Sequence, residues 1–509
     1  MKNLLLLILT LMIYSTSYPQ KIKYDDVKVD LSRLKNDRKK YISSRNVLYN
    51  ADSLLTLGYN IPLSGNEQKF SDYLTTLQRS FINTTGKDFP PSNFFYEGKN
   101  MIDTNLVFTI FRKMPKGGLL HLHPSAGNNA EWMVKNLTYM DNCYMYTLSD
   151  GKAHYGAMMF FNPDSVSSGW ESLKLLREEN KITDEEIVKM LTFDQSDKDN
   201  KKIWGDFEQI FRRVGFINYE PAFRLFTRSL FDSLLADGSQ YIELRTSLGG
   251  VYDISGKKFT PEECLLIYKE IIADVKKEHP QFDAKIIFSG FRGATKERVM
   301  TDLLTAYDLR KKYPDLLLGY DQVSEEDRWN KTSYYLDEFF AIDSITKKHG
   351  HDLPFYFHNG ESTLPSNDNL IDAVMLNTRR IGHGINLFRF PLLELAVKKK
   401  QIALEVCPLS NQILGYVDDL RMHPASGYIK RDIPMTLNTD DPQIFNYNGL
   451  TYDFWTAFMA WELDLKTIKK LALNSLAYSG MNKSEKKKAL NYFNTKWDEF
   501  IQEQVNLIP

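Results

Sequence analysis

The chain has 509 residues, of which 43% are hydrophobic and 25% are charged, and its 64 Lys and Arg nearly balance its 65 Asp and Glu. This composition predicts a folded globular protein that is too long for one ordinary core and fits a large barrel with accessory segments. Because the positive and negative charges cancel, the net charge of the protein does not favour binding to nucleic acid or to a membrane surface. Small neutral or weakly charged molecules remain candidate substrates.

The first residues have the layout of a secretory signal peptide. Residues 1–19 combine an early lysine, an apolar run of about a dozen residues and small residues around Ser15 to Ser17. The apolar run is too short to span a bilayer comfortably, and no cysteine follows it that would carry a lipid anchor. A buried first helix is the alternative interpretation. We expect an exported protein, secreted or periplasmic, without a membrane span.

The number and spacing of the cysteines limit the disulfide bonds and metal sites that the chain can form. Cys143, Cys264 and Cys407 are the three cysteines of the chain. Three cysteines do not make a disulfide scaffold in an exported protein, so we expect at most one bridge and one thiol left over. Since no C-x-x-C motif occurs, a metal site in this chain would use histidines and carboxylates.

The pattern along the chain changes after residue 112. Residues 20–112 predict an N-terminal helical segment, because mixed-charge amphipathic stretches run through it up to the interruption DFPPSNF. Residues 113–509 instead alternate short β-branched or aromatic runs with helix-like stretches. Eight runs are strand candidates: 118–123, 240–247, 284–291, 316–323, 354–361, 380–385, 402–410 and 434–441. Eight strands with intervening helices predict an α/β fold of the (β/α)8 TIM barrel type.

The interval between the first two strand candidates, about 124–239, is longer than one helix needs. It contains the polar stretch DQSDKDNKK, which is typical of a loop, followed by aromatic segments with helical spacing. We therefore predict a long helical insertion over one end of the barrel. Residues 464–504 predict packed helices with solvated lysine faces.

Polar residues gather at the C-terminal ends of the predicted strands, where the active site of a (β/α)8 barrel lies. Four of the nine histidines fall there. The residues concerned are His121 and His123 after the first run, His358 and Glu361 after the fifth, His383 in the sixth, and Asp440 and Asp441 at the end of the eighth. Because His121 and His123 are two residues apart, they project from the same side of a strand.

Imidazoles combined with a carboxylate form a site that suits Zn²⁺, with iron, manganese or cobalt as lesser options. Such a metal generates hydroxide at neutral pH, a nearby histidine can take a proton from the water, and a free carboxylate can protonate the substrate. Each motif alone has a simpler interpretation: HLH as structural histidines, GHG as a tight turn, and the acidic pair before Pro442 as a helix cap. Their joint position at strand ends favours a metal site.

Several longer motifs resemble a known family. MPKGGLLHLH, FHNGES, LNTRRIGHGINL, EVCPLSNQIL and NTDDPQIFNYNGLTYDF look like the adenosine deaminase family of metal-dependent amidohydrolases, and they are most similar to its secreted adenosine deaminase-related growth factor subgroup. The resemblance covers about residues 100–480. The signal peptide and the helical N-terminal segment also fit this subgroup, in which the N-terminal helices support dimerisation, so the resemblance is compatible with a homodimer.

Because the motifs align with those of the family, each functional residue of the family has an equivalent position in this sequence. The resemblance implies four ligands for one Zn²⁺ per chain: His121, His123, His358 and Asp440. Glu361 would protonate a purine ring nitrogen, His383 would deprotonate or orient the attacking water, and Asp441 would bind a neighbouring ring nitrogen and help to hold the nucleophile. The implied reaction is hydrolytic deamination of adenosine or a related purine nucleoside or base: hydroxide adds to C6, a tetrahedral intermediate forms and ammonia leaves.

The substrate pocket departs from this pattern. Pro124 follows the second histidine, where the subgroup has an aspartate that contacts ribose. Phe291 stands where the subgroup has a histidine that faces the sugar, and Ser324 stands where the family has a glycine whose N–H meets the purine. Trp204 matches an aromatic residue that lines the pocket, whereas Cys143 has no nearby partner of the kind that the subgroup's insertion carries.

The loss of an aspartate and a histidine removes two hydrogen-bond partners of the sugar, and such partners discriminate strongly between substrates. We therefore expect adenosine to be bound less tightly than by typical members, and a modified purine nucleoside or a free base becomes an alternative substrate. Two other interpretations stay open: a metal-dependent amidohydrolase that cleaves another C–N bond, and an extracellular binding or signalling protein with vestigial catalysis. The retention of all the catalytic and ligand positions favours the deaminase.

Overall fold

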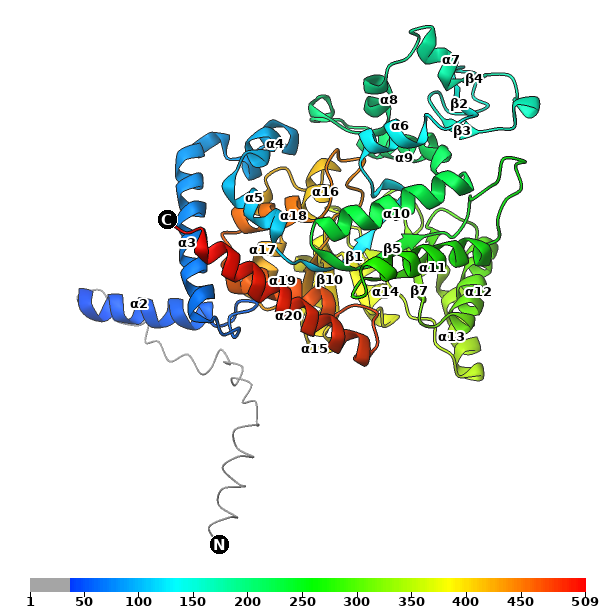
Figure 1. The fold of residues 1–509 in the computed structure, drawn as a ribbon. Coiled ribbons are helices and arrows are strands. Elements are labelled where there is room, and N and C mark those ends of the chain that lie inside the picture. Colours follow the sequence, from blue (N-terminus) through cyan, green and yellow to red (C-terminus); the bar gives the residue numbers. More distant parts are fainter. Residues whose placement is uncertain (1–36) are drawn as a thin grey trace.

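Eight parallel strands form the centre of the molecule. A computed structural model describes residues 37–509 (Figure 1), so the expected signal peptide at residues 1–19 lies outside the described residues. The central strands are β1 (Gly117–Leu122), β5 (Ser239–Thr246), β6 (Asp283–Phe291), β7 (Leu317–Val323), β8 (His358–Asn359), β9 (Arg380–His383), β10 (Ala403–Val406) and β11 (Met435–Leu437). Each of them lies at one of the eight runs that the sequence predicted as strands.

The strands close into a barrel. They form two parallel sheets in the orders β1-β5-β6-β7 and β8-β9-β10-β11. Parallel bridges join the edges of these sheets: Tyr320 of β7 pairs with Phe355 just before β8, and Leu122 of β1 pairs with Asp440 just after β11. The ring therefore runs in chain order, and the predicted (β/α)8 barrel is confirmed.

Helices cover the outside of the barrel (Figure 1). They are α10 (Glu220–Ala236), α11 (Pro261–Glu278), α12 (Lys296–Lys312), α13 (Leu336–His349), α14 (Asn369–Met375), α15 (Pro391–Lys400), α16 (Pro408–Ile413), α17 (Ala425–Lys430), α18 (Thr451–Ala460), α19 (Leu465–Ala477) and α20 (Lys483–Asn506). Local sequence fixes where they begin. In α11, for example, Thr260 and Glu263 form a capping box and Pro261 occupies the first turn, so the helix starts directly after the preceding loop.

The insertion after β1 contains helices and, in addition, a small sheet that the sequence analysis did not predict. Its helices are α6 (Ala130–Leu137), α7 (Leu173–Glu178), α8 (Asp184–Leu191) and α9 (Ile203–Arg213). The antiparallel sheet has the order β3-β2-β4, with β2 (Cys143–Tyr146), β3 (Met158–Phe160) and β4 (Trp170–Ser172). Strands of three or four residues are too short to show a clear alternation, although Cys143 and Met145 are buried on either side of the half-buried Tyr144.

Four helices precede the barrel: α2 (Arg38–Ser53), α3 (Gly65–Thr85), α4 (Phe95–Asp103) and α5 (Leu106–Lys113). Helix α3 packs against α20, where the rings of Phe70 and Phe500 meet edge to face at 5.6 Å. Buried Glu67 of α3 accepts hydrogen bonds from Lys469 (2.6 Å) and from the indole of Trp497 (2.8 Å). These contacts tie α3 to the C-terminal helices, whereas α2 buries no residue of its own.

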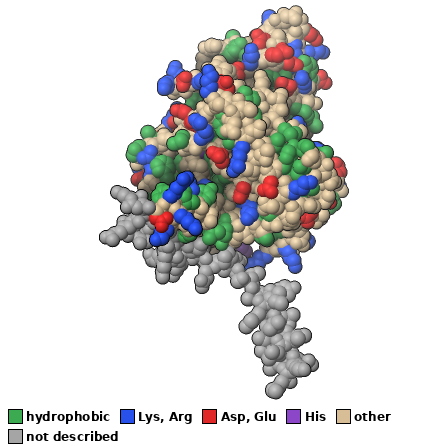
Figure 2. Space-filling model, turned by 90° about the vertical axis from the view of Figure 1, so that its left-hand side faces the viewer, with side chains coloured by type: hydrophobic (Ala, Val, Ile, Leu, Met, Phe, Trp, Pro, Cys, Tyr) green, Lys and Arg blue, Asp and Glu red, His purple; other side chains and the backbone are tan. Residues whose placement is uncertain are grey.

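Three further features of the structure concern membrane spans, disulfide bonds and surface charge. Within residues 37–509, no helix is both long and apolar enough to cross a bilayer. All three cysteines are buried and unpaired, so the bridge that the sequence left open does not form. On the face shown in Figure 2, acidic and basic side chains are interspersed, as expected from the balanced composition.

Candidate active site

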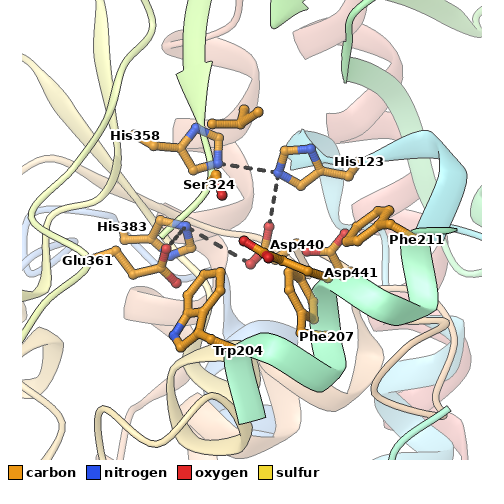
Figure 3. A pocket seen from close by; sticks show the side chains of 12 residues that line it. His123, Trp204, Phe207, Phe211, Ser324, His358, Glu361, His383, Asp440 and Asp441 are labelled. Atoms are coloured by element: carbon orange, nitrogen blue, oxygen red, sulfur yellow. Dashed lines mark hydrogen bonds and ion pairs between the residues drawn. The ribbon is translucent and has the colours of Figure 1, made fainter. Parts of the chain in front are cut away.

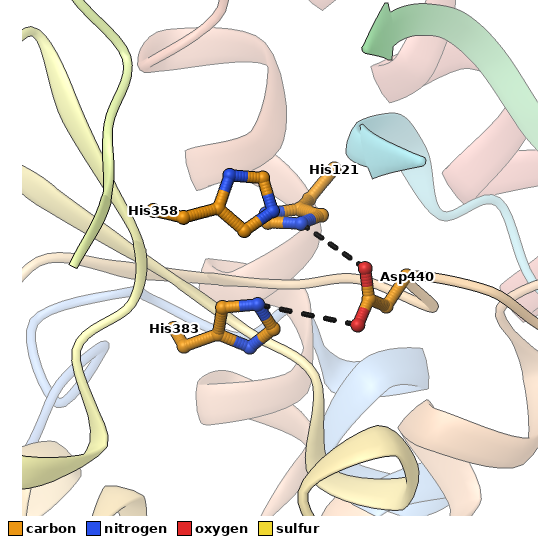
Figure 4. Close-up of side chains that lie close together, drawn as sticks. All are labelled: His121, His358, His383 and Asp440. Carbon is orange, nitrogen blue, oxygen red and sulfur yellow. Dashed lines mark ion pairs between the residues drawn. The ribbon is translucent and has the colours of Figure 1, made fainter. Parts of the chain in front are cut away.

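Histidines and an aspartate from the strand ends converge at the C-terminal mouth of the barrel (Figures 3 and 4). His121 Nε2 and His123 Nε2 lie 3.2 Å and 3.4 Å from Asp440 Oδ1, and His123 Nε2 lies 3.3 Å from His358 Nε2. One ligand atom each of His121, His358, His383 and Asp440 lies within 4.8 Å of the others. The structure thus brings together the residues that the sequence proposed as ligands, and it adds His383 to the same cluster.

Unusual backbone conformations aim these side chains. His383 and Asp440 have φ angles of 62° and 65°, in the left-handed region that residues other than glycine rarely adopt. Gly382 allows the rings to approach, because a Cβ at this position would come within 3.0 Å of His121 Cε1 and 3.1 Å of the His358 Cα. Strained backbone of this kind is concentrated at functional sites, which supports a functional interpretation of the strand ends.

Two carboxylates that sequence reasoning missed orient the histidine rings. Glu405 of β10 lies 2.8 Å from His121 Nδ1, and Asp321 of β7 lies 2.7 Å from His358 Nδ1. Both carboxylates are completely buried. Because each one engages the Nδ1 side of its ring, the Nε2 atoms are left to face the centre of the cluster. This is the arrangement by which carboxylates orient metal-bound histidines in general.

Two buried arginines connect the carboxylates. Arg245 of β5 pairs with both Asp321 and Glu405, and Arg380 of β9 pairs with Glu405 at 2.6 Å. Burial alone would raise the pKa of Glu405, but the charges of Arg245 and Arg380 hold it well below its usual range. The contact with His358 and the charge of Arg245 likewise lower the pKa of Asp321 against the effect of burial. A fixed ionic layer therefore lies below the histidines.

The acidic and basic groups beside the cluster have strongly shifted pKa values. Burial, with the negative charges of Asp440 and Glu326, raises the pKa of Glu361 well above its usual value, and its carboxylate lies 3.5 Å from His383 Nε2. Burial lowers the pKa of His383 well below its usual value. Burial and the charge of Asp440 raise the pKa of Asp441. At neutral pH these shifts favour a protonated Glu361 beside a neutral His383.

A cavity of about 200 Å³ opens above these groups. It is lined by His123, Trp204, Phe207, Glu208, Phe211, Val323, Ser324, His358, Glu361, His383, Asp440 and Asp441. Trp204, Phe207, Glu208 and Phe211 come from one face of α9, because their spacing of three and four residues repeats with the helical turn (Figure 3). The insertion therefore supplies an aromatic wall opposite the polar floor. Of this wall, sequence reasoning found only Trp204.

The residues at which the sequence departs from the family pattern lie in different places. Ser324 lines the cavity, with a φ of 99° that explains why a glycine would suit this position. Pro124 lines an adjoining cavity of about 180 Å³, which also contacts His123. Phe291 does not line the catalytic cavity, contrary to expectation. It is the last residue of β6, it is 43% exposed, and its ring packs edge to face on Trp329.

Comparisons with known proteins agree with this geometry. The model of the family described as adenosine deaminase matches residues 181–496, which is more than half of the chain. The chain belongs to the adenosine deaminase family. It is 35% identical to adenosine deaminase 2 of Dictyostelium discoideum over 92% of this chain and 88% of the relative. It is 33% identical to human adenosine deaminase 2 over 88% of this chain and 91% of the relative.

A solved structure with the same fold is an amidohydrolase from Burkholderia ambifaria with bound Zn, which is 14% identical and superposes with a TM-score of 0.57 over 79% of this chain and 95% of that chain. At this identity the likeness concerns the fold alone. It agrees with the closed ring of parallel strands, and the family membership agrees with a metal-dependent hydrolase whose His and Asp residues meet at the mouth of the barrel.

Proposed function

We propose that the protein is a zinc-dependent hydrolytic deaminase that converts adenosine or a related purine nucleoside or base into the 6-oxo compound and ammonia. One observation carries the proposal: a buried His and Asp cluster, a carboxyl group with a raised pKa and a neutral histidine meet in a cavity with an aromatic wall. Family membership and the names of the relatives support the same reaction.

The residues fit a bound Zn²⁺. His121 Nε2 and Asp440 Oδ1 are buried and lie 3.2 Å apart, but neither makes a hydrogen bond of suitable geometry, which is uncommon unless another group satisfies such atoms. Burial lowers the pKa of His358 to about 3, so this ring is neutral and able to bind a cation. We assign His121, His123, His358 and Asp440 as the ligands of one ion. When bound, Zn²⁺ lowers the pKa of water toward neutrality and thereby provides hydroxide.

The proton transfers follow from the two groups beside the ligands. Neutral His383, held by Asn411 at 3.3 Å on its Nδ1 side, is placed to accept or orient the proton of the attacking water. Burial and nearby carboxylates raise the pKa of Glu361 well above its usual value and so favour its protonated form, which can donate to a purine ring nitrogen. A proton on that nitrogen withdraws electrons from C6 and stabilises the tetrahedral intermediate.

Asp441 and the aromatic wall complete the assignment. Asp441 Oδ1 is buried, lines the cavity and has no partner, and a protonated carboxyl group there donates a hydrogen bond to a second ring nitrogen. Trp204 and Phe207 provide apolar surface for the flat purine ring. These contacts fix the ring so that C6 faces the ligand cluster, which favours deamination over cleavage of an unrelated C–N bond.

The direct test is the conversion of adenosine. The loss of absorbance at 265 nm, together with the release of ammonia, is the expected result for the purified protein, and Glu361→Gln is expected to abolish both. A protein that leaves adenosine, 2′-deoxyadenosine and adenine unchanged with zinc present would refute the proposal.

The residues at the positions where the subgroup contacts ribose support a relaxed specificity toward the sugar. Pro124 has no side-chain acceptor and no backbone N–H, so it offers nothing to a sugar hydroxyl. Phe291 is exposed, packs on Trp329 and does not line the cavity, so it offers the sugar no replacement partner. We expect a weaker dependence on the sugar hydroxyls than typical members show. Steady-state kinetics on adenosine, 2′-deoxyadenosine and adenine test this, and a strong loss of efficiency on removal of a hydroxyl would contradict it.

We also propose that the protein is exported and forms a homodimer. The sequence of residues 1–19 supports export, to the periplasm or the cell exterior. Helix α2 supports dimerisation, because Tyr41, Val47, Leu48 and Tyr49 are between 46% and 66% exposed and helices that expose large apolar side chains usually pack against a partner. Light scattering on the mature chain and on a variant that lacks residues 38–53 tests the dimer; an unchanged mass would contradict the role of α2.

A further inference from the structure

Two hydrogen bonds join the loop after β7 to the loop that carries Glu361. The backbone N–H of Glu361 donates a hydrogen bond of 2.7 Å to Oε1 of Glu326. The next residue of each loop repeats the pattern, because the hydroxyl of Ser362 donates to Asp327 at 2.7 Å. Glu326 is 4% exposed, whereas Asp327 lies at the surface. Glu326 is therefore the buried half of this contact.

Glu326 is itself held in one orientation. Its second carboxylate oxygen, Oε2, accepts hydrogen bonds from the side-chain amides of Asn369 (2.7 Å) and Asn367 (3.2 Å). The amide of Asn359, next to His358, donates in turn to the carbonyl of Asn369 at 2.8 Å. Three donors on one buried carboxylate make strong, charge-assisted hydrogen bonds. The network thus connects the end of β8 to the loop after β7.

The side chain of Glu361 has few contacts of its own. One carboxyl oxygen has no hydrogen-bond partner, and the other lies 3.5 Å from His383. Its position depends on its backbone, which turns sharply at Gly360, where φ is 80° and a Cβ would come within 2.6 Å of Asn386 Oδ1. The hydrogen bond to Glu326 is the next fixed point of the backbone after this turn.

We propose that Glu326 is a positioning residue for Glu361: through the backbone N–H of Glu361 it holds the proton-donating carboxyl group at the distance that a purine ring nitrogen requires. This inference rests on the proposed function, because it assigns Glu326 an effect on the acid step alone. Glu326 does not line the cavity, so we assign it no contact with the substrate.

The test compares Glu326→Ala with Glu325→Ala in the full chain. Glu325 precedes Glu326 in the same loop and makes no hydrogen bond to Glu361, so it is a matched control. A displacement of a reacting group by about 1 Å costs about 100-fold in rate, so we expect kcat of Glu326→Ala to fall by about that factor while KM stays within about threefold. Glu326→Gln keeps an acceptor for the Glu361 N–H but removes a negative charge that helps to raise the pKa of Glu361, so it should retain more of kcat than Glu326→Ala does.

A double-mutant cycle separates positioning from a general structural role. Because Glu361→Gln abolishes turnover, the cycle is measured as binding: in a Glu361→Gln background, Glu326→Ala should cause little further loss of affinity, because no donor remains to be positioned. The affinity for an analogue with a tetrahedral carbon, measured on all four proteins, should show the same lack of additivity. Additive losses, or equal losses for Glu325→Ala and Glu326→Ala, would overturn the inference. If Glu326→Ala does not fold, Glu326→Gln and Glu326→Asp carry the cycle. An inactive wild type would refute the proposed function instead.

Discussion

Arg245 is the residue at which stability and metal binding are most directly linked. Its guanidinium pairs with Asp321 and Glu405, which orient His358 and His121, and it also donates to the carbonyl of Tyr356 at 2.8 Å. Arg245→Met keeps the length and apolar stem of the side chain but removes the charge. Asp321 then loses its arginine partner, whereas Glu405 keeps Arg380 at 2.6 Å.

The expected loss of folding free energy follows from the difference between Asp321, which loses its arginine partner, and Glu405, which keeps Arg380. Removal of one partner of a buried ion pair costs about 3–5 kcal/mol, because the remaining charge stays buried and uncompensated. Since Glu405 retains its second arginine, we expect the cost of one broken pair and not of two. Asp321 also orients His358, and the loss of such an orienting contact weakens metal binding by about 10- to 100-fold. Arg245→Met should therefore lower both the free energy of unfolding and the zinc affinity.

Urea unfolding and competition for zinc with a chelating indicator measure the two effects. Arg228→Met is the matched control, since Arg228 pairs with Asp232 and Glu278 on the surface, where such pairs contribute about 0–1 kcal/mol. The control should bind zinc as the wild type does. If Arg245→Met loses no more stability than Arg228→Met and keeps its zinc affinity, the ionic layer below the histidines does not have the role that we assign to it.

Four further substitutions test the site. His123→Ala should lose bound metal, whereas His383→Ala should keep it and lose about 10²- to 10⁴-fold in kcat; metal analysis would contradict this assignment if only His383→Ala lost the ion. Gly382→Ala should cost about 1–3 kcal/mol in urea unfolding and weaken zinc binding, because the new Cβ meets both ligand rings; wild-type values would argue against the close packing. Ser324→Gly should stabilise the chain by about 1 kcal/mol, since it relieves a φ of 99°, and an unchanged unfolding midpoint would contradict that.

Sequence patterns predicted the barrel well because its strands alternate with amphipathic helices, and the strand ends then indicated the candidate site. His121, His358 and Asp440 could be found since each follows an apolar run at a place where a barrel exposes its side chains. The choice between His123 and His383 as the third histidine ligand depends on differences of a few ångströms in the positions of the rings. The spacing of these residues along the chain does not determine such differences.

Other parts depended on contacts between distant segments. Glu405 and Asp321 are single carboxylates inside apolar strands, and their partners lie on other strands, so nothing local distinguishes them from isolated polar residues. The small sheet of the insertion has strands too short for a periodic signal. Phe291 was expected to face the substrate, but its ring packs on Trp329, from the loop after the next strand, and it does not line the cavity.

Zinc removal and replacement is the measurement that tests the central claim most directly. The purified protein should contain about one zinc ion per chain, the number that the proposed ligands His121, His123, His358 and Asp440 would hold together. Dialysis against a chelator should abolish the loss of 265 nm absorbance with adenosine, and one equivalent of zinc should restore it. Full activity in the metal-free protein, or no purine deamination after zinc is restored, would contradict the account.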